Sequence, residues 1–376
     1  MTLDDIALTF VPRLGHRGAM HLLDSFGSAE AIYRAPYEQL AGGEVHLRPD
    51  VAKSICSRAG FAEAAREMEY CRRNAIRPVA STDDEYPEAL RAIADAPHVI
   101  YVLGDVGALA SLHTLSMVGT RRMTPYGERM CNRLVEGLSV QLPDAVVVSG
   151  LAFGTDAAAH RAAIAYGLRT VGVLANALPA VTPSQNTALA KDMLAHGGAL
   201  VSEVSSQTRQ NGSLFIPRNR IIAGLSQGLV VVESATDGGS LSTARYADGY
   251  SRTVMAVPGR ATDLMSSGTN MLIRNRTAQM VLTADDVAAE LGWTPDCDAP
   301  GASAAEEMRS TELRAAMSEE QLRVLECFGE GGGGESLEGL VARTGFDTGT
   351  VTLALLELEL AGAVKALPGQ MYEKLI

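Results

Sequence analysis

The sequence predicts an α/β fold whose core is a doubly wound parallel β-sheet. From residue 114 onward, short apolar runs alternate with helical stretches, and the runs are apolar on both faces. Strands of this kind lie in parallel sheets that helices cover on both sides. Three of the runs end directly in glycine-containing turns, and ligands of such sheets bind at the carboxyl ends of the strands. The six expected strands span residues 115–118, 145–148, 170–174, 199–201, 228–232 and 253–257.

The rest of the chain predicts two further units. Residues 1–75 read as helices, and an early glycine-containing turn leads into an apolar helical repeat. This is the outline of a helical SAM/HhH-like domain whose turn amides can meet a phosphate, although any two-helix bundle could show it. The extended α/β core then occupies 76–293. Residues 294–318, rich in Ala, Ser, Pro and acidic side chains, are predicted to be a linker. Residues 319–376 fit a small helical unit with a terminal hairpin, the outline of a C-terminal winged helix.

The composition is that of a folded protein without metal or membrane signals. Of 376 residues, 47% are hydrophobic and 20% charged. No apolar run is long enough to span a membrane and no signal peptide is recognisable, so we expect a cytoplasmic protein. The five cysteines form no CxxC pair and the histidines no HExxH motif, so we expect no disulfide, metal or other cofactor.

The acidic net charge is concentrated at the two ends of the chain. The chain carries a formal charge of −12, but residues 111–290 hold 15 basic and 13 acidic side chains, and 14 of the basic ones are arginine. Arginine suits both bidentate phosphate contact and stacking on bases. The overall charge therefore does not exclude nucleic acid, because a local basic surface is what matters.

Four segments of the core combine glycine, hydroxyl and arginine residues at expected strand ends and helix starts. They read VGTRRMTPYG from Val118, SGLAFGTDAAAH from Ser149, FIPRNRIIAGLS from Phe215 and GGSLSTA from Gly238. Glycine permits close approach of a ligand, turn amides and a helix dipole attract an anion, and arginine can clamp it. Because three of these turns share one edge of the predicted sheet, they predict an anion-binding site there.

The same segments resemble the DprA/Smf (DNA-processing protein A) family. The family pattern V-G-S-R-x-x-T-x-Y-G reads VGTRRMTPYG here, and S-G-x-A-x-G-I-D-x-x-A-H reads SGLAFGTDAAAH. The elements RNRIIAGLS, VVES, GGSLSTA, AVPG and GTNMLI follow in the order of the family. Thr120, Thr155 and Thr182 replace the usual Ser, Ile and Tyr, and the usual F-P-x-R-N-R reads FIPRNR.

The resemblance implies a SAM-like N-terminal unit, a Rossmann-like core that forms a homodimer and binds single-stranded DNA, and a winged-helix tail. It also implies a role in natural transformation, in which the protein protects incoming single strands and helps load the RecA recombinase. Phe215 would be a base-stacking platform, with a ring in the core as the alternative. The residues implied for the DNA-binding site are Gly119, Thr120, Arg121, Gly150, Phe215, Arg218, Asn219, Arg220, Gly239 and Ser240.

An enzyme is the main alternative. Related Rossmann-like proteins of the LOG type cleave nucleotide N-glycosidic bonds with the loop P-G-G-x-G-T-x-x-E, which here reads DGGSLSTAR and lacks the acid. Asp156 and Glu233 are candidate carboxylates, with a helix-start cap and a strand-end hydrogen bond as their structural alternatives. The chain has no G-x-x-x-x-G-K-[ST] motif, which argues against a nucleotide-driven motor. The glycine spacing after Val118 is not G-x-G-x-x-G, which argues against dinucleotide binding. We therefore expect a binding protein without catalytic residues, and a nucleotide-binding or nucleotide-hydrolysing LOG-type enzyme is the alternative.

The C-terminal unit is expected to contact protein rather than DNA. Its candidate recognition helix, 347–361, contains no Arg, Lys, Asn or Gln, the residues that read base edges and phosphates. Residues 291–376 carry a charge of −9, with 6 basic and 15 acidic side chains. The helix also holds more leucine and valine than one buried stripe requires.

Overall fold

The computed structural model describes residues 1–42, 45–209, 212–294, 317–328, 335–360, 363–367 and 371–374. The chain forms two compact units, Met1–Asp296 and Cys297–Ile376. Apart from its ends, the expected linker 294–318 lies outside the described residues. No helix in the described part of the chain is long and apolar enough to cross a membrane.

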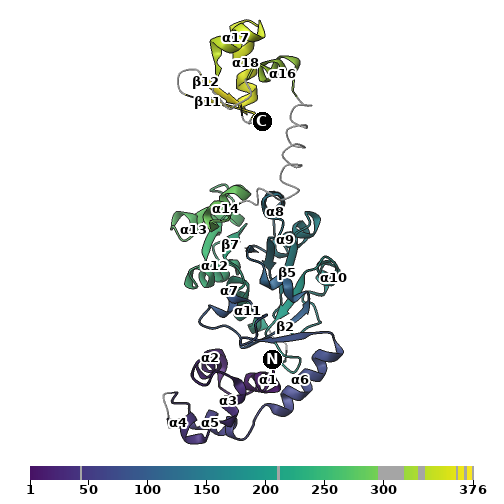
Figure 1. The fold of residues 1–376 in the computed structure, drawn as a ribbon, viewed down its shortest axis with the longest axis vertical. Coiled ribbons are helices and arrows are strands. Elements are labelled where there is room, and N and C mark those ends of the chain that lie inside the picture. The colour runs from purple at the N-terminus through teal and green to yellow at the C-terminus, as the bar shows by residue number, and fades with distance from the viewer. Residues whose placement is uncertain are drawn as a thin grey trace. The chain divides into compact units, whose positions relative to one another are not determined.

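A nine-stranded sheet forms the centre of the first unit (Figure 1), in the order β1-β2-β6-β5-β4-β3-β7-β8-β9. The strands are β1 (Arg77–Ala80), β2 (Val99–Gly104), β3 (Thr114–Val118), β4 (Val146–Ser149), β5 (Arg169–Val173), β6 (Ala199–Ser202), β7 (Gly228–Val231), β8 (Thr253–Ala256) and β9 (Gln279–Met280). All neighbours from β6 to β9 are parallel, whereas β2 pairs antiparallel with both β1 and β6. The six expected strands and the parallel sheet are confirmed, and β1, β2 and β9 were not expected.

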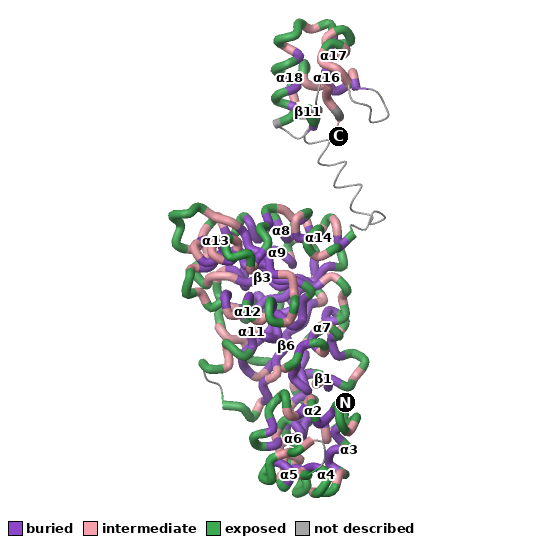
Figure 2. Tube along the Cα trace, turned by 90° about the vertical axis from the view of Figure 1, so that its left-hand side faces the viewer, coloured by how far each residue is buried: buried purple, intermediate pink, exposed green. Residues whose placement is uncertain are grey.

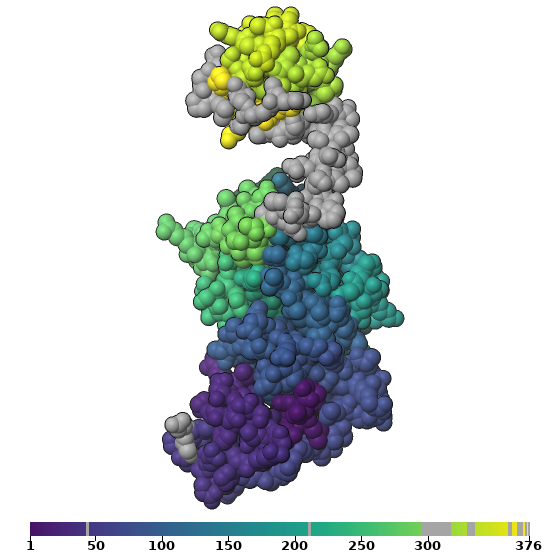
Figure 3. Space-filling model, in the orientation of Figure 1, coloured from purple at the N-terminus to yellow at the C-terminus, as the bar shows by residue number. Residues whose placement is uncertain are grey.

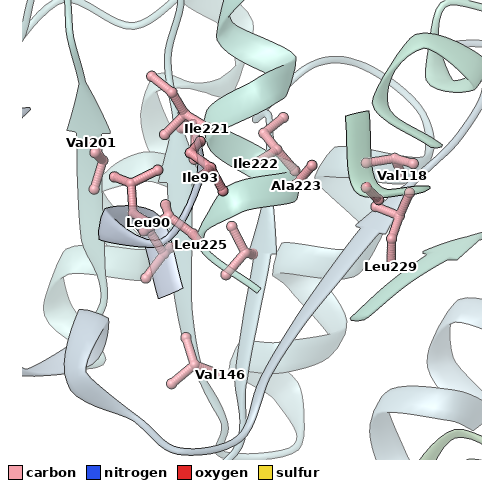
Figure 4. Packing of buried hydrophobic residues seen from close by; sticks show 14 of the residues in the cluster. Leu90, Ile93, Val118, Val146, Val201, Ile221, Ile222, Ala223, Leu225 and Leu229 are labelled. Carbon is pink, nitrogen blue, oxygen red and sulfur yellow. The ribbon is translucent and has the colours of Figure 1, made fainter. Parts of the chain in front are cut away.

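Helices cover both faces of this sheet because successive strand residues point to opposite sides. Val146 and Val148 pack in one buried cluster, and Val147 packs in another. The first cluster lies under α7, α11, α12 and α13, and Figure 4 shows Leu90 and Ile93 packing beside Ile221. The second lies under α8, α9 and α14. The helices are α7 (Glu88–Arg91), α8 (Pro125–Gln141), α9 (Thr155–Ala165), α10 (Thr187–Ala195), α11 (Phe215–Gly224), α12 (Ser240–Gly249), α13 (Ser267–Arg274) and α14 (Ala284–Leu291).

The order of the strands reverses between β3 and β7. From β3, the chain adds β4, β5 and β6 on one side and then β7 and β8 on the other. In doubly wound sheets the ligand crevice lies outside the carboxyl ends of the strands at such a switch point. The turns that follow β3 and β7 therefore border the expected ligand crevice.

The N-terminal helices pack against the core within the same compact unit (Figure 3). The carboxylate of Glu67 accepts hydrogen bonds from the backbone N–H and hydroxyl of Ser206, at 2.8 and 2.6 Å. The expected glycine-containing turn near the N-terminus ends at Gly15, where α2 begins. The φ of Gly15 is +67°, a conformation that favours glycine. The six helices are α1 (Leu3–Thr9), α2 (Gly15–Phe26), α3 (Ala29–Arg34), α4 (Tyr37–Gly42), α5 (Pro49–Cys56) and α6 (Phe61–Arg73).

The second unit is a small helical domain with a terminal hairpin, as expected. Its helices are α16 (Glu319–Glu326), α17 (Leu337–Thr344) and α18 (Thr348–Leu360). Strands β11 (Val364–Leu367) and β12 (Met371–Lys374) form the hairpin, and β10 (Glu335–Ser336) pairs with β12. Helix α18 buries Val351, Leu355 and Leu358 and leaves Leu353 and Leu356 exposed, as the alternation of purple and green along it shows (Figure 2). The expected surplus of apolar side chains on this helix is confirmed.

Candidate nucleic-acid interface

The turns after β3, β4 and β7 meet backbone to backbone at the switch point. The Thr120 N–H donates to the Glu233 carbonyl at 2.7 Å, and the Thr155 N–H donates to the Thr120 carbonyl at 3.1 Å. A Cβ on Gly119 would stand 2.4 Å from the Thr155 hydroxyl oxygen, and one on Gly154 2.3 Å from the Thr120 carbonyl oxygen. Both glycines are therefore required by close packing, which fixes the β3–α8 turn that carries Arg121.

Arg218 is buried across the carboxyl ends of β4 and β5. Its Nη1 donates to the Gly150 carbonyl at 2.7 Å and to the Val173 carbonyl. A Cβ on Gly150 would stand 2.8 Å from the guanidinium carbon, so glycine makes room for this side chain. Burial lowers the pKa of Arg218 to about 10, against the favourable charge of Asp156, so the group stays positive at neutral pH. A fixed positive charge thus underlies the site.

Phe215, at the start of α11, lies close to two arginines. The guanidinium carbon of Arg121 is 5.5 Å from its ring centroid and that of Arg218 is 6.0 Å away. Arg121 is exposed, whereas the ring is half-buried. Cation–π contact orients a guanidinium beside an aromatic face. Of the two alternatives for Phe215, this position at the edge of the sheet favours the stacking platform over the core ring.

The start of α12 borders the same edge of the sheet. The Asn219 amide donates to the Ser242 hydroxyl at 2.9 Å and accepts from Arg218 Nε at 3.3 Å, which joins α11 to α12. The Ser240 hydroxyl donates to the Ser234 hydroxyl at 2.9 Å, so it fixes the turn. A Cβ on Gly239 would meet open space. The residue therefore leaves room for a ligand at the helix start, where amides favour an anion.

Arg220 does not face the other predicted site residues. It is 4% exposed, and its guanidinium pairs with the carboxylate of Glu203 and lies 3.9 Å from that of Asp95. His16, on α2, lies 3.2 Å from the same Glu203 carboxylate. Residues two apart on a helix point to nearly opposite sides, so Arg218 and Arg220 cannot both face the sheet edge. Arg220 instead pairs α11 with Glu203, whose carboxylate His16 of the N-terminal helices also contacts.

Both candidate carboxylates have structural partners. Glu233 accepts hydrogen bonds from the Thr124 N–H at 2.9 Å and the Thr124 hydroxyl at 2.5 Å, and so anchors the start of α8. Asp156 is buried, accepts from the Ala152 N–H at 3.3 Å, and has its pKa raised by burial, with Arg218 opposing the shift. Glu233 makes the strand-end hydrogen bond named as its structural alternative, and Asp156 braces the loop before α9 rather than capping that helix.

The arginines of the two parts of the first unit differ in their partners. Within the described chain, nine of the ten arginines in residues 1–110 lie within 4.0 Å of a carboxylate. Of the 14 in residues 111–290, Arg220 alone does so among the described residues. Those arginines of the core that are exposed therefore carry positive charge that no carboxylate of the described chain neutralises, and they are available to an anionic partner despite the near-neutral sum of this region.

Three exposed apolar side chains near this edge were not singled out from the sequence. Phe153, Ile216 and Leu264 are 44%, 62% and 67% exposed. Phe153 precedes the glycine that touches the β3–α8 turn, and Ile216 follows Phe215. The feature of the sequence that could have identified them is an apolar residue inside an otherwise polar turn. Two depressions of about 350 and 540 Å³, at the amino ends of β8 and β9 and beside α6, contain none of the predicted site residues.

Comparison with known proteins shows which family the chain resembles. Residues 77–292 match the family model of DNA recombination-mediator protein A, and residues 308–370 match the DprA winged helix domain. The Escherichia coli protein Smf is 34% identical over 299 residues, which are 77% of this chain and 75% of that protein. The Bacillus subtilis DNA processing protein DprA is 35% identical over 231 residues, 61% and 76% of the two chains.

Solved structures give the same result. The crystal structure of DprA from Streptococcus pneumoniae matches with a TM-score of 0.66 at 28% identity and covers 77% of this chain and 98% of that one. The Helicobacter pylori DNA processing protein A, described for its single-stranded DNA binding mode, matches with a TM-score of 0.51 at 27% identity, over 57% and 95% of the two chains. The α/β core with its C-terminal winged helix is thereby confirmed, and this chain belongs to the DNA recombination-mediator protein A, or DprA/Smf, family.

Proposed function

We propose that this protein binds single-stranded DNA at the carboxyl edge of its sheet. The observation that carries the proposal is the grouping of Arg121, Phe215 and Arg218 at the switch point, beside the open start of α12. We call Thr120, Arg121, Phe215, Arg218 and Gly239 the carboxyl-edge site. A guanidinium can contact a phosphate while an aromatic ring stacks on a base, and a duplex hides its base faces. The single-stranded DNA binding of the Helicobacter pylori relative supports this choice.

The same arrangement favours a binding protein over an enzyme. Glu233 is occupied by the start of α8, and Asp156 lies buried beside Arg218. A general acid or base must reach its substrate, and neither carboxylate is placed to do so. We propose that the protein has no catalytic residues and that its action on DNA is to hold it.

The wider role we propose follows from the family. The protein would act in the cytoplasm as a homodimer, protect incoming single strands during natural transformation, and help load the RecA recombinase. The test is whether RecA filaments form faster on single strands carrying this protein than on strands carrying the variant Arg121→Ala. Equal rates with both proteins would contradict the loading role, but the proposal that the protein binds single strands would still stand.

A gel-shift experiment tests the binding itself. Labelled single-stranded and double-stranded oligonucleotides of equal length are titrated with the protein at several salt concentrations, beside a nucleotide-hydrolysis assay. We expect tighter binding of the single strand, affinity that falls as salt rises because counterions are released, and no hydrolysis. Equal affinity for the duplex would overturn single-strand binding, and hydrolysis lost in Arg121→Ala would favour the LOG-type enzyme.

A further inference from the structure

Two exposed arginines outside the carboxyl-edge site flank the start of α8. Arg122 directly follows Arg121, and its backbone N–H donates to the Thr120 hydroxyl at 3.1 Å. Arg260 lies in the loop between β8 and α13. Both are exposed, and neither has a carboxylate within 4.0 Å in the part of the chain that the structure describes. Their charges are therefore free to meet a ligand.

Hydrogen bonds hold the two loops in place. The Tyr126 hydroxyl, on α8, donates to the Pro258 carbonyl at 2.6 Å, which ties the loop after β8 to the start of α8. The Asn270 side chain accepts from the Gly259 N–H at 3.1 Å and donates to the Gly259 carbonyl at 3.0 Å. Arg260 thus extends from an anchored backbone, and ordering this loop upon binding costs little conformational entropy.

The same surface presents an exposed apolar side chain. The 3-10 turn Leu264–Ser266 lies against the β3–α8 turn, because the Thr120 hydroxyl donates to the Met265 sulfur at 3.6 Å. Leu264 begins this turn and is 67% exposed. An exposed apolar side chain close to unpaired arginines suits a nucleic acid strand, whose bases are apolar on their faces, better than it suits a simple polyanion.

We propose that a bound single strand continues from the carboxyl-edge site over the start of α8 to the loop after β8. Its phosphates would contact Arg122 and then Arg260, and Leu264 would contact a base between them. Strands in a sheet lie about 4.8 Å apart, so the route from β5, whose last carbonyl accepts a hydrogen bond from Arg218, to β8 is roughly 19 Å long. This inference rests on the proposed function and adds the path of the bound DNA, which crosses the carboxyl edge of the sheet from β5 towards β8.

The test compares short and long oligonucleotides. Oligo-dT of about 4 and about 16 nucleotides, the range of site sizes for single-strand-binding domains, is titrated against full-length protein. Arg122→Ala and Arg260→Ala should each weaken binding of the long strand roughly two- to fivefold, as for one exposed charge contact, and leave the short strand unchanged. Each should also reduce the slope of log K against log salt by about 0.7. Asp263, exposed on the same loop, opposes the phosphates, so Asp263→Asn should tighten long-strand binding.

Arg274→Ala is the matched control, because Arg274 is also exposed but stands at the far end of α13. If Arg121→Ala weakens both lengths while Arg122→Ala and Arg260→Ala match the control, the route is wrong and the carboxyl-edge site stands. If Arg122→Ala and Arg260→Ala weaken binding of the short and the long strand equally, both arginines contact the part of the strand that the carboxyl-edge site holds, and the route is again wrong. If Arg121→Ala changes nothing at either length, the proposed function itself fails at this edge.

Discussion

Arg218 and Gly150 are matched to each other, because the guanidinium fills the space that a side chain on Gly150 would occupy. The Nη1–O distance is 2.7 Å, and an added Cβ would lie 2.8 Å from the Arg218 Cζ. The arginine is held by two strand-end carbonyls and balanced by Asp156, so it supports the site from beneath rather than reaching into solvent.

Removing Arg218 should therefore cost stability. Arg218→Ala leaves the buried Asp156 without its main counter-charge and two carbonyls without their donor, and we expect a loss of about 3 kcal/mol in the free energy of unfolding. Urea denaturation measures it. Gly150→Ala should destabilise as well, because it displaces the same side chain. Wild-type stability in both variants would show that Arg218 is not structurally required.

Arg121 should behave in the opposite way. It is exposed and makes no ion pair within the described chain, so Arg121→Ala should change the free energy of unfolding by less than about 0.5 kcal/mol. Single-strand binding should weaken by about 1.5–3 kcal/mol, the value for a hydrogen bond to a charged group. Fluorescence anisotropy with a labelled oligonucleotide measures this. Normal binding by Arg121→Ala would show that Arg121 is not part of the site. Unfolding of this variant would show that Arg121 has a structural role.

Phe215 offers a direct optical test of base stacking. Phe215→Ala should weaken binding by about 1–3 kcal/mol per stacked base and leave stability nearly unchanged, whereas a core ring would cost about 3–5 kcal/mol of stability. Phe215→Trp should retain affinity and show fluorescence quenching by oligonucleotide. The chain has one natural tryptophan, Trp293, which is 8% exposed and hydrogen-bonded to Gln227, so the wild-type protein is the control. Equal quenching in both proteins would argue against stacking.

His160 should make the protein sensitive to mild acid. Its Nδ1 lies 2.6 Å from the Thr170 hydroxyl, which itself donates to the Val147 carbonyl, so His160 Nδ1 is the donor and Nε2 is buried without a hydrogen-bond partner in the described chain. Burial lowers the pKa of His160 to about 3, and Arg218 and Arg161 add to the shift. The unfolded chain binds the proton first, so this residue lowers stability as pH falls from about 6.5 towards 3.

The effect is measurable above the pH range in which carboxylates titrate. Between pH 6 and 5 the free energy of unfolding should fall with a slope approaching 1.4 kcal/mol per pH unit for this one proton. His160→Gln keeps a donor to Thr170 but cannot titrate, so its curve should be flatter. Parallel curves for the two proteins would contradict the assignment.

Six of the nine strands of the sheet could be predicted because each is a short apolar run, whereas β1, β2 and β9 and the antiparallel direction of β2 were not predicted. Residues 99–103 form an apolar run like the others, yet β2 is antiparallel, and its direction depends on pairing with β6 about 100 residues away. The four segments that form the site could be predicted, but which side chains of each segment face it could not. The sequence RNR could not show that Arg218 faces the sheet edge and Arg220 faces Glu203, because the partners that decide this are distant in the chain.

The C-terminal unit should contribute little to DNA affinity, although winged helices often read DNA. On α18 the exposed side chains include Leu353 and Leu356, at 57% and 53%, together with Glu357 and Glu359, and the helix contains no basic residue. Phosphate would be repelled by residues 291–376, whose charge is −9, whereas two exposed leucines suit a protein partner.

A chain ending at Asp296, the boundary of the first compact unit, tests this. Its single-strand affinity at fixed salt should equal that of the full chain or be slightly tighter, because acidic charge has been removed. In the full chain, Leu353→Lys with Leu356→Lys should also leave affinity unchanged or tighter, while any protein contact made by this face should weaken. A tenfold loss of affinity on truncation, with the oligomeric state intact by light scattering, would show that the unit contacts DNA, since the loss of repulsion alone can only tighten binding.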